Sequence, residues 1–215
     1  MKRLNSLAII AILALAISSC GTGSGSAASE ETAEGSEAEA PASGEAVTYG
    51  IDAANSEVAW KGEVAGVYGH NGVINIKSGS MEVAGGSITG GEVVIDMTSI
   101  QPLDTASYTA SGKTPQDLVD HLATGDFFLV EEFPEATFVV KSHTANQLVG
   151  DLTIRGNTNE ETVELTSLEI TEEGLNGAGT LVFDRQKYEV SWEHYIQDYI
   201  LSDDIALTLS IVASK

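Results

Sequence analysis

The stretch "DIALTLSIVA", residues 204–213, alternates large apolar side chains with small or polar ones. One face carries Ile205, Leu207, Leu209 and Ile211, and the other carries Ala206, Thr208 and Ser210. A period of two is typical of a β-strand with one face against an apolar interior. We therefore expect a strand here, with Leu207 and Leu209 pointing inward.

Working outward, the same alternation recurs in other segments. "EVVIDMT" sets Val93, Ile95 and Met97 against polar neighbours, and "QLVGDLTIRG" does the same with Leu152 and Ile154. We count about eight short strands at the spacing typical of a sandwich or barrel. The glycine pairs 85–86 and 90–91 are expected at tight connections. No repeated βαβ pattern is present, so the sheet should be antiparallel.

One helix should interrupt the strands. In "TPQDLVDHLATG", Thr114 is a good N-cap, Pro115 suits the first helical position, and Asp117 completes an acidic capping box. Gly125 is expected to end the helix. The following crossing, "GDFFLVEEFPEATF" (residues 125–138), holds Phe127, Phe128, Phe133 and Phe138, four of the chain's five phenylalanines. Such a cluster could plug one end of a barrel or line the mouth of a cavity.

The amino-terminal residues resemble a secretory signal. Lys2 and Arg3 precede "LAIIAILALAI" (residues 7–17), and an apolar run of this length rises only ~16 Å as a helix, about half a bilayer core. "ISSCG" (residues 17–21) resembles the bacterial lipobox, in which the cysteine is freed and diacylated. Cys20 is the only cysteine, so we expect it to carry the lipid anchor, although a chance cysteine at an ordinary cleavage site is the alternative.

Composition divides the remaining chain. After Cys20, residues 21–46 contain no apolar side chain larger than alanine, so they should form a disordered acidic tether. We therefore expect a signal at residues 1–19, the lipidated cysteine and tether at 20–46, and one domain at 47–215. The formal charge is −22, and removal of Lys2 and Arg3 makes it −24. This charge argues against nucleic acid and against adsorption to anionic lipid surfaces.

The order of motifs resembles the YceI-like family of lipocalin-like, polyisoprenoid-binding proteins. The resemblance covers residues 49–214 and rests on a series of short motifs in sequence order. They are Trp60-Lys61-Gly62, Gly69-His70-Asn71-Gly72, Ile95-Asp96-Met97, Asp126-Phe127-Phe128, Phe133-Pro134, Leu152-Thr153-Ile154-Arg155-Gly156 and Phe183-Asp184-Arg185. The long acidic tether and the lipobox depart from the family pattern.

The resemblance implies an extended eight-stranded antiparallel β-barrel, residence in the cell envelope, and an interior that holds an isoprenoid or similar long-chain lipid. On this basis we expect the interior or mouth to be lined by Val93, Ile95, Met97, Phe127, Phe128, Phe138, Leu152, Ile154, Phe183, Leu207 and Leu209. His70 and Arg155 are candidates for contact with the lipid head group. Without the resemblance, His70 would be read as a structural histidine and Arg155 as the partner of a nearby carboxylate.

Two other functions stay open at this stage. The first is an envelope enzyme that acts on a lipid-like substrate through His70 and a carboxylate. The second is a structural lipoprotein whose barrel is filled by its own side chains. The four histidines lack close metal-ligand spacing, and we expect neither a metal nor a cofactor. "SGKT" (residues 111–114) imitates a nucleotide-binding loop without the required upstream glycine.

Overall fold

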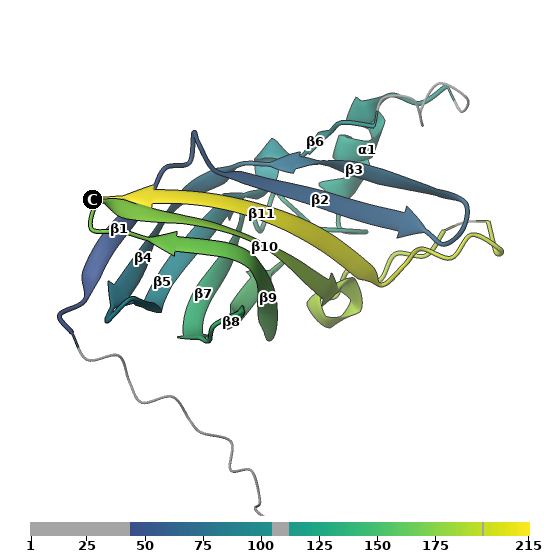
Figure 1. The fold of residues 1–215 in the computed structure, drawn as a ribbon. Helices are drawn as coiled ribbons and strands as arrows, with labels where there is room; N and C mark the ends of the chain where they lie inside the picture. The colour runs from purple at the N-terminus through teal and green to yellow at the C-terminus, as the bar shows by residue number, and fades with distance from the viewer. Residues whose placement is uncertain (1–43, 105–111, 195) are drawn as a thin grey trace, which may run out of the picture. The chain divides into compact units, whose positions relative to one another are not determined.

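The computed structural model describes residues 44–104, 112–194 and 196–215. It contains one antiparallel sheet that closes on itself (Figure 1). The strands are β1 (Val47–Ile51), β2 (Glu57–Val64), β3 (Tyr68–Ile74), β4 (Ile76–Ala84), β5 (Ser87–Asp96), β6 (Gln101–Pro102), β7 (Glu135–His143), β8 (Gln147–Ile154), β9 (Asn157–Ile170), β10 (Gly174–Asp184) and β11 (Asp204–Ser214). The helices are η1 (Met97–Ser99), α1 (Pro115–Leu122) and η3 (Arg185–Tyr188).

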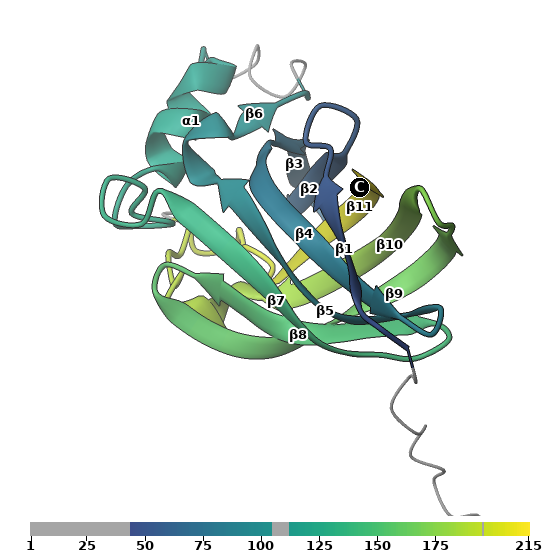
Figure 2. The same cartoon turned by 90° about the vertical axis from the view of Figure 1, so that its left-hand side faces the viewer.

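These strand segments form a barrel of eight strands, because three pairs of segments act as single long strands. β1 and β2 lie one after the other along the same edge of β11. β3 and β4 are separated only by Asn75 and pair with β2 and β1 respectively. β5 and β6 then pair with β4 and β3. The predicted fold class, an eight-stranded antiparallel barrel with one short α-helix, is confirmed (Figure 2).

The two ends of the barrel differ in their connections. At one end, which we call the hairpin end, short turns at residues 85–86, 144–146 and 171–173 join neighbouring strands. At the other, the helix end, α1 and the crossing 123–134 join β6 to β7, and residues 185–203 join β10 to β11. The long connections therefore gather at one end (Figures 1 and 2).

The two predicted glycine turns have different outcomes. Gly85 and Gly86 have positive φ angles of 58° and 82° and form the tight β4–β5 turn, as expected. The prediction for Gly90 and Gly91 was wrong, because both lie inside β5. Gly91 has a φ of 139°, and a Cβ built there would lie 2.4 Å from the main-chain oxygen of Ser80. The close approach of β4, where the register shifts, explains this glycine.

The helix begins where the sequence predicts and ends earlier. Thr114 caps α1, and its side chain and that of Asp117 form the expected capping box. The helix ends at Leu122 and is capped by Ala123, so the predicted end at Gly125 was wrong. The carbonyls of Leu122 and Ala123 accept hydrogen bonds from Phe128 and Val130, which turns the chain away from the helix. Among the described residues, no helix is long and apolar enough to cross a bilayer.

Strand β5 is shorter than the alternation indicates. It ends at Asp96, whose side chain accepts a hydrogen bond from the Thr98 main-chain N–H and caps η1. Met97 is therefore buried from a 3₁₀ turn rather than from a strand. The inward faces of β7 and β11 agree with the prediction, since Phe138, Leu207 and Leu209 all face the interior.

Candidate functional site: the barrel interior

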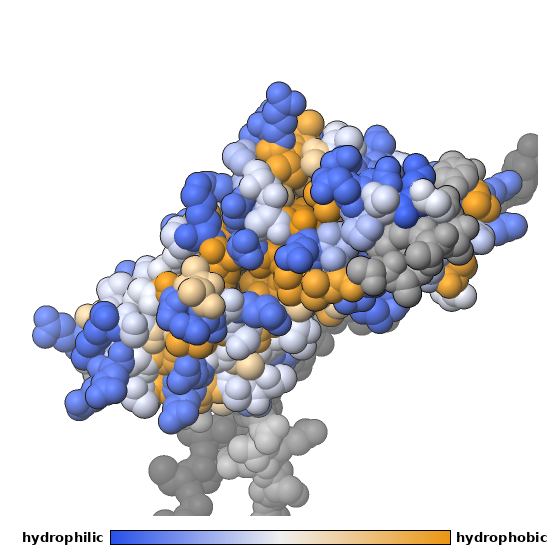
Figure 3. All heavy atoms as spheres, turned by 90° about the horizontal axis from the view of Figure 1, so that it is seen from above, coloured by the Kyte–Doolittle hydropathy of each residue, from blue (hydrophilic) through white to orange (hydrophobic). Residues whose placement is uncertain are grey.

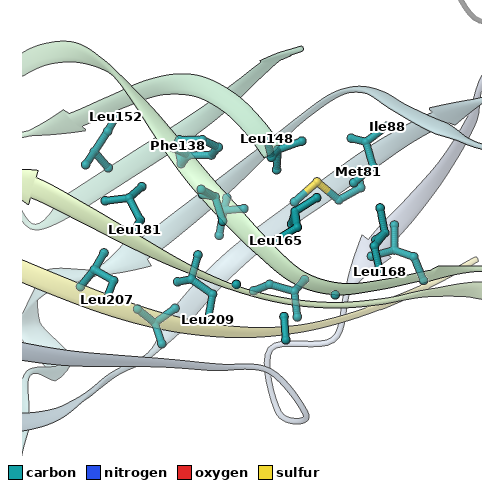
Figure 4. A pocket seen from close by; sticks show the side chains of 18 of the residues that line it. Met81, Ile88, Phe138, Leu148, Leu152, Leu165, Leu168, Leu181, Leu207 and Leu209 are labelled. Carbon is teal, nitrogen blue, oxygen red and sulfur yellow. The ribbon is translucent and has the colours of Figure 1, made fainter. Parts of the chain in front are cut away.

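A cavity of about 110 Å³ runs inside the barrel between the sheet walls (Figure 4). Apart from Thr137, all its lining residues are apolar or glycine. They are Val58, Met81, Ile88, Val93, Ile95, Phe138, Leu148, Leu152, Val163, Leu165, Leu168, Leu175, Gly177, Ala178, Gly179, Leu181, Leu207, Leu209 and Ile211. No ionisable side chain lines this space, so its chemistry suits a hydrocarbon and offers no acid or base to a substrate.

The structure separates the predicted lining residues into two groups. Those that line the cavity are Val93, Ile95, Phe138, Leu152, Leu207 and Leu209. Those that pack in or against the core outside the cavity are Met97, Phe127, Phe128, Ile154 and Phe183. The alternation therefore locates inward faces, but it does not tell a cavity wall from a filled core.

Sequence reasoning missed the contribution of β9 and β10. Leu165, Leu168, Leu175 and Leu181 line the cavity, together with residues 177–179. The sequence pattern that could have revealed them is an alternation on β10 in which glycine takes two of the inward positions. These positions are Leu175, Gly177, Gly179 and Leu181. A search for apolar side chains overlooks such a strand.

The glycines of β10 make room inside the barrel. A register shift between Ala178 and Gly179 marks a bulge against β9. A Cβ built on Gly177 would meet only Leu168 Cδ1 at 3.5 Å and a main-chain oxygen at 4.0 Å. A Cβ on Gly179 would lie 2.8 Å from both Val163 Cγ1 and the Glu164 carbonyl oxygen. Gly177 thus leaves room for a methyl group at ordinary contact distance, whereas Gly179 permits close contact between strands.

Aromatic side chains close the helix end of the barrel. The ring of Phe127 lies 5.4 Å from that of Trp192 and 5.0 Å from that of His121, between centroids. Phe183 packs edge-on against Tyr188, which is fully buried. The phenylalanine-rich crossing therefore contributes to a plug, while Phe138 alone of that segment lines the cavity.

Arg155 holds this plug in place through main-chain contacts. Its Nη1 donates hydrogen bonds to the carbonyl oxygens of Phe127 at 2.8 Å and Glu189 at 2.7 Å. The guanidinium therefore donates hydrogen bonds to main-chain carbonyls. The sequence had suggested a lipid head group or a nearby carboxylate as its partner. Arg155 joins the β8–β9 turn to the two segments that close the helix end.

Arg185 anchors the long connection between β10 and β11. It is only 3% exposed, and it donates to the carbonyl oxygens of Val190 at 2.5 Å and Ser202 at 3.0 Å. Its Nη2 also lies 2.9 Å from a carboxylate oxygen of Asp203. These contacts make Arg185 an anchor of the turn that follows β10.

His70 makes the contact expected of a structural histidine. Its Nδ1 lies 2.8 Å from Asp104 Oδ2, and both side chains are largely buried. Partial burial acts to raise the pKa of the Asp104 carboxyl. Hydrogen bonds from the His70 ring and the Asn71 main-chain N–H outweigh that effect and hold this pKa below its usual range. His70 is not among the lining residues of the cavity.

A buried polar pair lies beside the plug. The Tyr188 hydroxyl donates to Glu161 Oε1 at 3.1 Å, and Lys187 Nζ lies 3.4 Å from the same oxygen. Burial and the neighbouring carboxylate raise the pKa of the Tyr188 phenol. Glu161 is 8% exposed and Lys187 is about half exposed, so the pair joins the buried end of β9 to the surface near η3. Within the described ranges, no cluster of His, Cys, Asp or Glu is arranged to hold a metal ion.

A closed antiparallel barrel around an apolar cavity, plugged at one end by aromatic side chains, defines the lipocalin-like class of β-barrels. The chain belongs to the YceI-like family, because the family model of the YceI-like domain matches residues 49–213. The predicted resemblance is therefore confirmed.

Relatives and solved structures are similar at moderate to low identity. A UPF0312 protein of Staphylococcus aureus is 38% identical over 95 residues, which are 41% of this chain and 56% of that protein. One of Staphylococcus epidermidis is 32% identical over 110 residues, 47% of this chain and 63% of that protein. The chain thus spans about 56–63% of the length of these two relatives.

Among solved structures, BcnA of Burkholderia cenocepacia has a TM-score of 0.57 at 21% identity, over 76% of this chain and 99% of BcnA. A domain of Saccharophagus degradans described as polyisoprenoid-binding has a TM-score of 0.49 at 11% identity, over 77% and 97% of the two chains. The likeness to BcnA shows the fold, and identities this low do not carry a ligand from one protein to another.

Proposed function

We propose that this protein is a non-enzymatic lipoprotein of the cell envelope that holds a long-chain lipid of isoprenoid type inside its barrel, for carriage or sequestration. The observation that carries the proposal is the cavity, whose wall is built of apolar side chains and glycine with Thr137 as the one exception. Such a wall has no group for catalysis but can bury hydrocarbon, which contributes ~0.8 kcal/mol for each methylene. Family membership supports the same ligand class.

The size of the cavity sets a condition on binding. At about 110 Å³ it is smaller than the roughly 300–1,000 Å³ of typical ligand pockets. A long lipid chain therefore enters only if lining side chains move apart. Leu168 on β9 lies beside Gly177 of β10, where the absence of a side chain leaves room for a methyl group. The proposal thus includes a barrel that widens when lipid binds.

The amino-terminal sequence supports the envelope location. The signal-like segment, Cys20 and residues 21–43 of the tether lie outside the described residues, so location and anchor remain predictions from sequence. A diacylated Cys20 would hold the protein at a membrane that the charge of −24 of the chain without Lys2 and Arg3 would not otherwise favour. We expect the domain to face the periplasm.

A tryptophan at Leu209 separates a ligand-holding barrel from a filled one. Leu209 lines the cavity from β11. In a widening barrel, Leu209→Trp should occupy ligand volume, lower the free energy of unfolding of the delipidated protein by less than about 1 kcal/mol, and sharply reduce bound lipid. In a filled core, overpacking should cost about 1–3 kcal/mol. Denaturant unfolding and native mass spectrometry of protein from its own host measure the two quantities.

The matched control is Thr208→Trp, which places the same side chain on the exposed outer face of the adjacent position. We expect this control to keep both stability and bound lipid. A strongly destabilised Leu209→Trp protein would favour the filled barrel, and unchanged lipid occupancy would remove Leu209 from the site. The alternative of an enzyme acting through His70 has no support from the cavity, whose lining residues do not include His70.

A further inference from the structure

We infer that the barrel selects an uncharged long-chain lipid, such as a prenyl alcohol, over its phosphorylated form, and that the inward-facing Glu161 contributes to this selection. The inference rests on the proposed function, because it names the ligand class of the same cavity. Three observations carry it: the composition of the wall, the partners of the basic side chains and the position of Glu161.

The wall offers nothing to an anionic head group. A phosphate moved out of water needs cations or several hydrogen-bond donors to compensate for its lost hydration. Thr137 is the one lining residue with a polar side chain, but it precedes the inward-facing Phe138 on β7, so its hydroxyl belongs to the opposite face of the strand. A hydroxyl-bearing lipid needs far less compensation, and one acceptor or donor suffices.

Most of the basic side chains that could supply charge already have partners. Lys61, Lys77, Lys141 and Lys187 each form an ion pair with a carboxylate. Arg155 and Arg185 donate to main-chain carbonyls at the helix end. Lys113 lies just before α1, and Lys215 Nζ lies 5.9 Å from the centre of the Tyr49 ring, outside the cavity lining. A phosphate would therefore have to compete for a cation or do without one.

Glu161 puts negative charge toward the inside of the barrel. On β9 the odd-numbered residues from Glu161 to Leu165 face inward, and Val163 and Leu165 line the cavity. Glu161 is the next inward position beyond Val163 toward the helix end, about 7 Å farther along the strand. Its Oε1 accepts from Tyr188 and lies 3.4 Å from Nζ of the half-exposed Lys187, so this long, partly solvated ion pair compensates the carboxylate only in part. A phosphate near this carboxylate would be repelled, whereas a lipid hydroxyl could donate a hydrogen bond to it.

The test compares two probes of equal chain length, geranylgeraniol and geranylgeranyl phosphate. The purified full chain is equilibrated with each probe, and the dissociation constant is obtained from bound lipid by native mass spectrometry. We expect the alcohol to bind wild type at least tenfold more tightly than the phosphate. Glu161→Gln should narrow this ratio severalfold by improving phosphate binding.

The matched control is Glu164→Gln, the same change at an exposed, outward position of β9. It should leave the ratio of the two dissociation constants unchanged, and thermal unfolding checks that both variants fold.

Equal or tighter binding of the phosphate than of the alcohol by wild type would overturn the inference, whatever the variants do. Loss of that binding in Lys215→Ala would then locate an anion site at the hairpin end. If folded Glu161→Gln has the same ratio of dissociation constants as wild type, Glu161 does not contribute to the discrimination between the two lipids. Failure of both probes to bind would instead overturn the proposed function.

Discussion

At the scale of single residues, partly buried hydrogen-bonded carboxylates fix the segments that surround the barrel. Asp104 follows β6 and accepts from the His70 ring and the Asn71 main-chain N–H, both on β3. The pair therefore holds the end of one long strand against its neighbour. Charge on Asp104 makes these hydrogen bonds stronger than neutral ones.

Asp104→Asn removes that charge and keeps the shape of the side chain. Hydrogen bonds to charged groups contribute about 1.5–3 kcal/mol, and neutral ones about 0.5–1.5 kcal/mol. We therefore expect the free energy of unfolding at pH 7 to fall by about 1 kcal/mol. The control is Asp126→Asn, which alters the more exposed contact with His121 and should cost less.

The same variant predicts a pH dependence with a definite sign. The pKa of Asp104 is lower in the folded protein than its ordinary value of about 3.9 in an unfolded chain. Its stabilisation is therefore complete above that value and is lost as pH falls through the lower folded pKa. Thermal unfolding of wild type and Asp104→Asn should differ at pH 7 and converge in acid, once Asp104 is protonated in the folded protein as well. A constant difference across this range would contradict the assignment.

At the scale of elements, strand β10 combines two glycines with different tasks. Gly177 leaves room for a methyl group beside Leu168, and Gly179 allows β9 to approach at the bulge. Both lie at inward positions of β10, so alanine substitutions at the two positions compare how tightly the wall is packed at two points.

Alanine at each position should give opposite results. Gly177→Ala adds a methyl group at ordinary contact distance and restricts the unfolded chain, so stability should stay equal or rise by up to about 1 kcal/mol. Gly179→Ala forces a Cβ to 2.8 Å from Val163 and from the Glu164 carbonyl and should cost about 1–3 kcal/mol. Urea unfolding measures both. Equal effects would mean that the wall around Gly177 is as tightly packed as the bulge.

These elements also show what the sequence could and could not predict. The alternation at residues 205–211 was readable because side chains on a strand alternate between faces regardless of tertiary context. The N-cap of α1 was equally local, since Thr114 and Asp117 bond within one turn. The end of that helix was not local, because carbonyls of its last turn bond to residues of the crossing.

The cavity depended on contacts far apart in sequence. Gly91 looked like a turn residue, and only the approach of β4 shows why glycine is needed within β5. Met97, Ile154 and Phe183 share the apolar character of the lining residues, yet they pack in the filled part of the interior. Bulges and strand register decide which apolar side chain faces empty space, and the bulges of β4–β5 and β9–β10 shift that register without a turn motif in the sequence.

At the scale of the whole molecule, exposed apolar side chains are distributed unevenly over the outer surface. Large exposed apolar side chains of the described residues are Val67, Tyr68, Leu103, Val139, Val182, Ile196 and Ile200. Most of them lie on the connections of the helix end. Figure 3 shows apolar residues among charged ones on the face that carries β3, β6 and α1.

The membrane anchor is tested at Cys20. If the lipobox is processed, wild type should sediment with membranes after cell breakage, and mass spectrometry should find a diacylglyceryl group on Cys20 at the mature amino terminus. Cys20→Ala should move the protein to the soluble fraction or leave its signal uncleaved. Ser19→Ala keeps a small residue before the cysteine and should behave as wild type. An unmodified Cys20 in wild type would remove the anchor and leave the barrel unaffected.

The position of β11 in the barrel has a consequence for how the chain folds. This strand pairs along its whole length with β10 and, on its other edge, with β2 and with β1 at Ile51 and Gly50. A nascent chain that lacks residues 204–214 therefore has two open sheet edges and an interior exposed to water. Ring closure must bring together partners such as Lys61 and Ala206 or Gly50 and Ser214, which are 145 and 164 residues apart, and contacts of such long sequence separation form slowly. The chain should thus remain open and susceptible to proteases or chaperones until this strand has been synthesised.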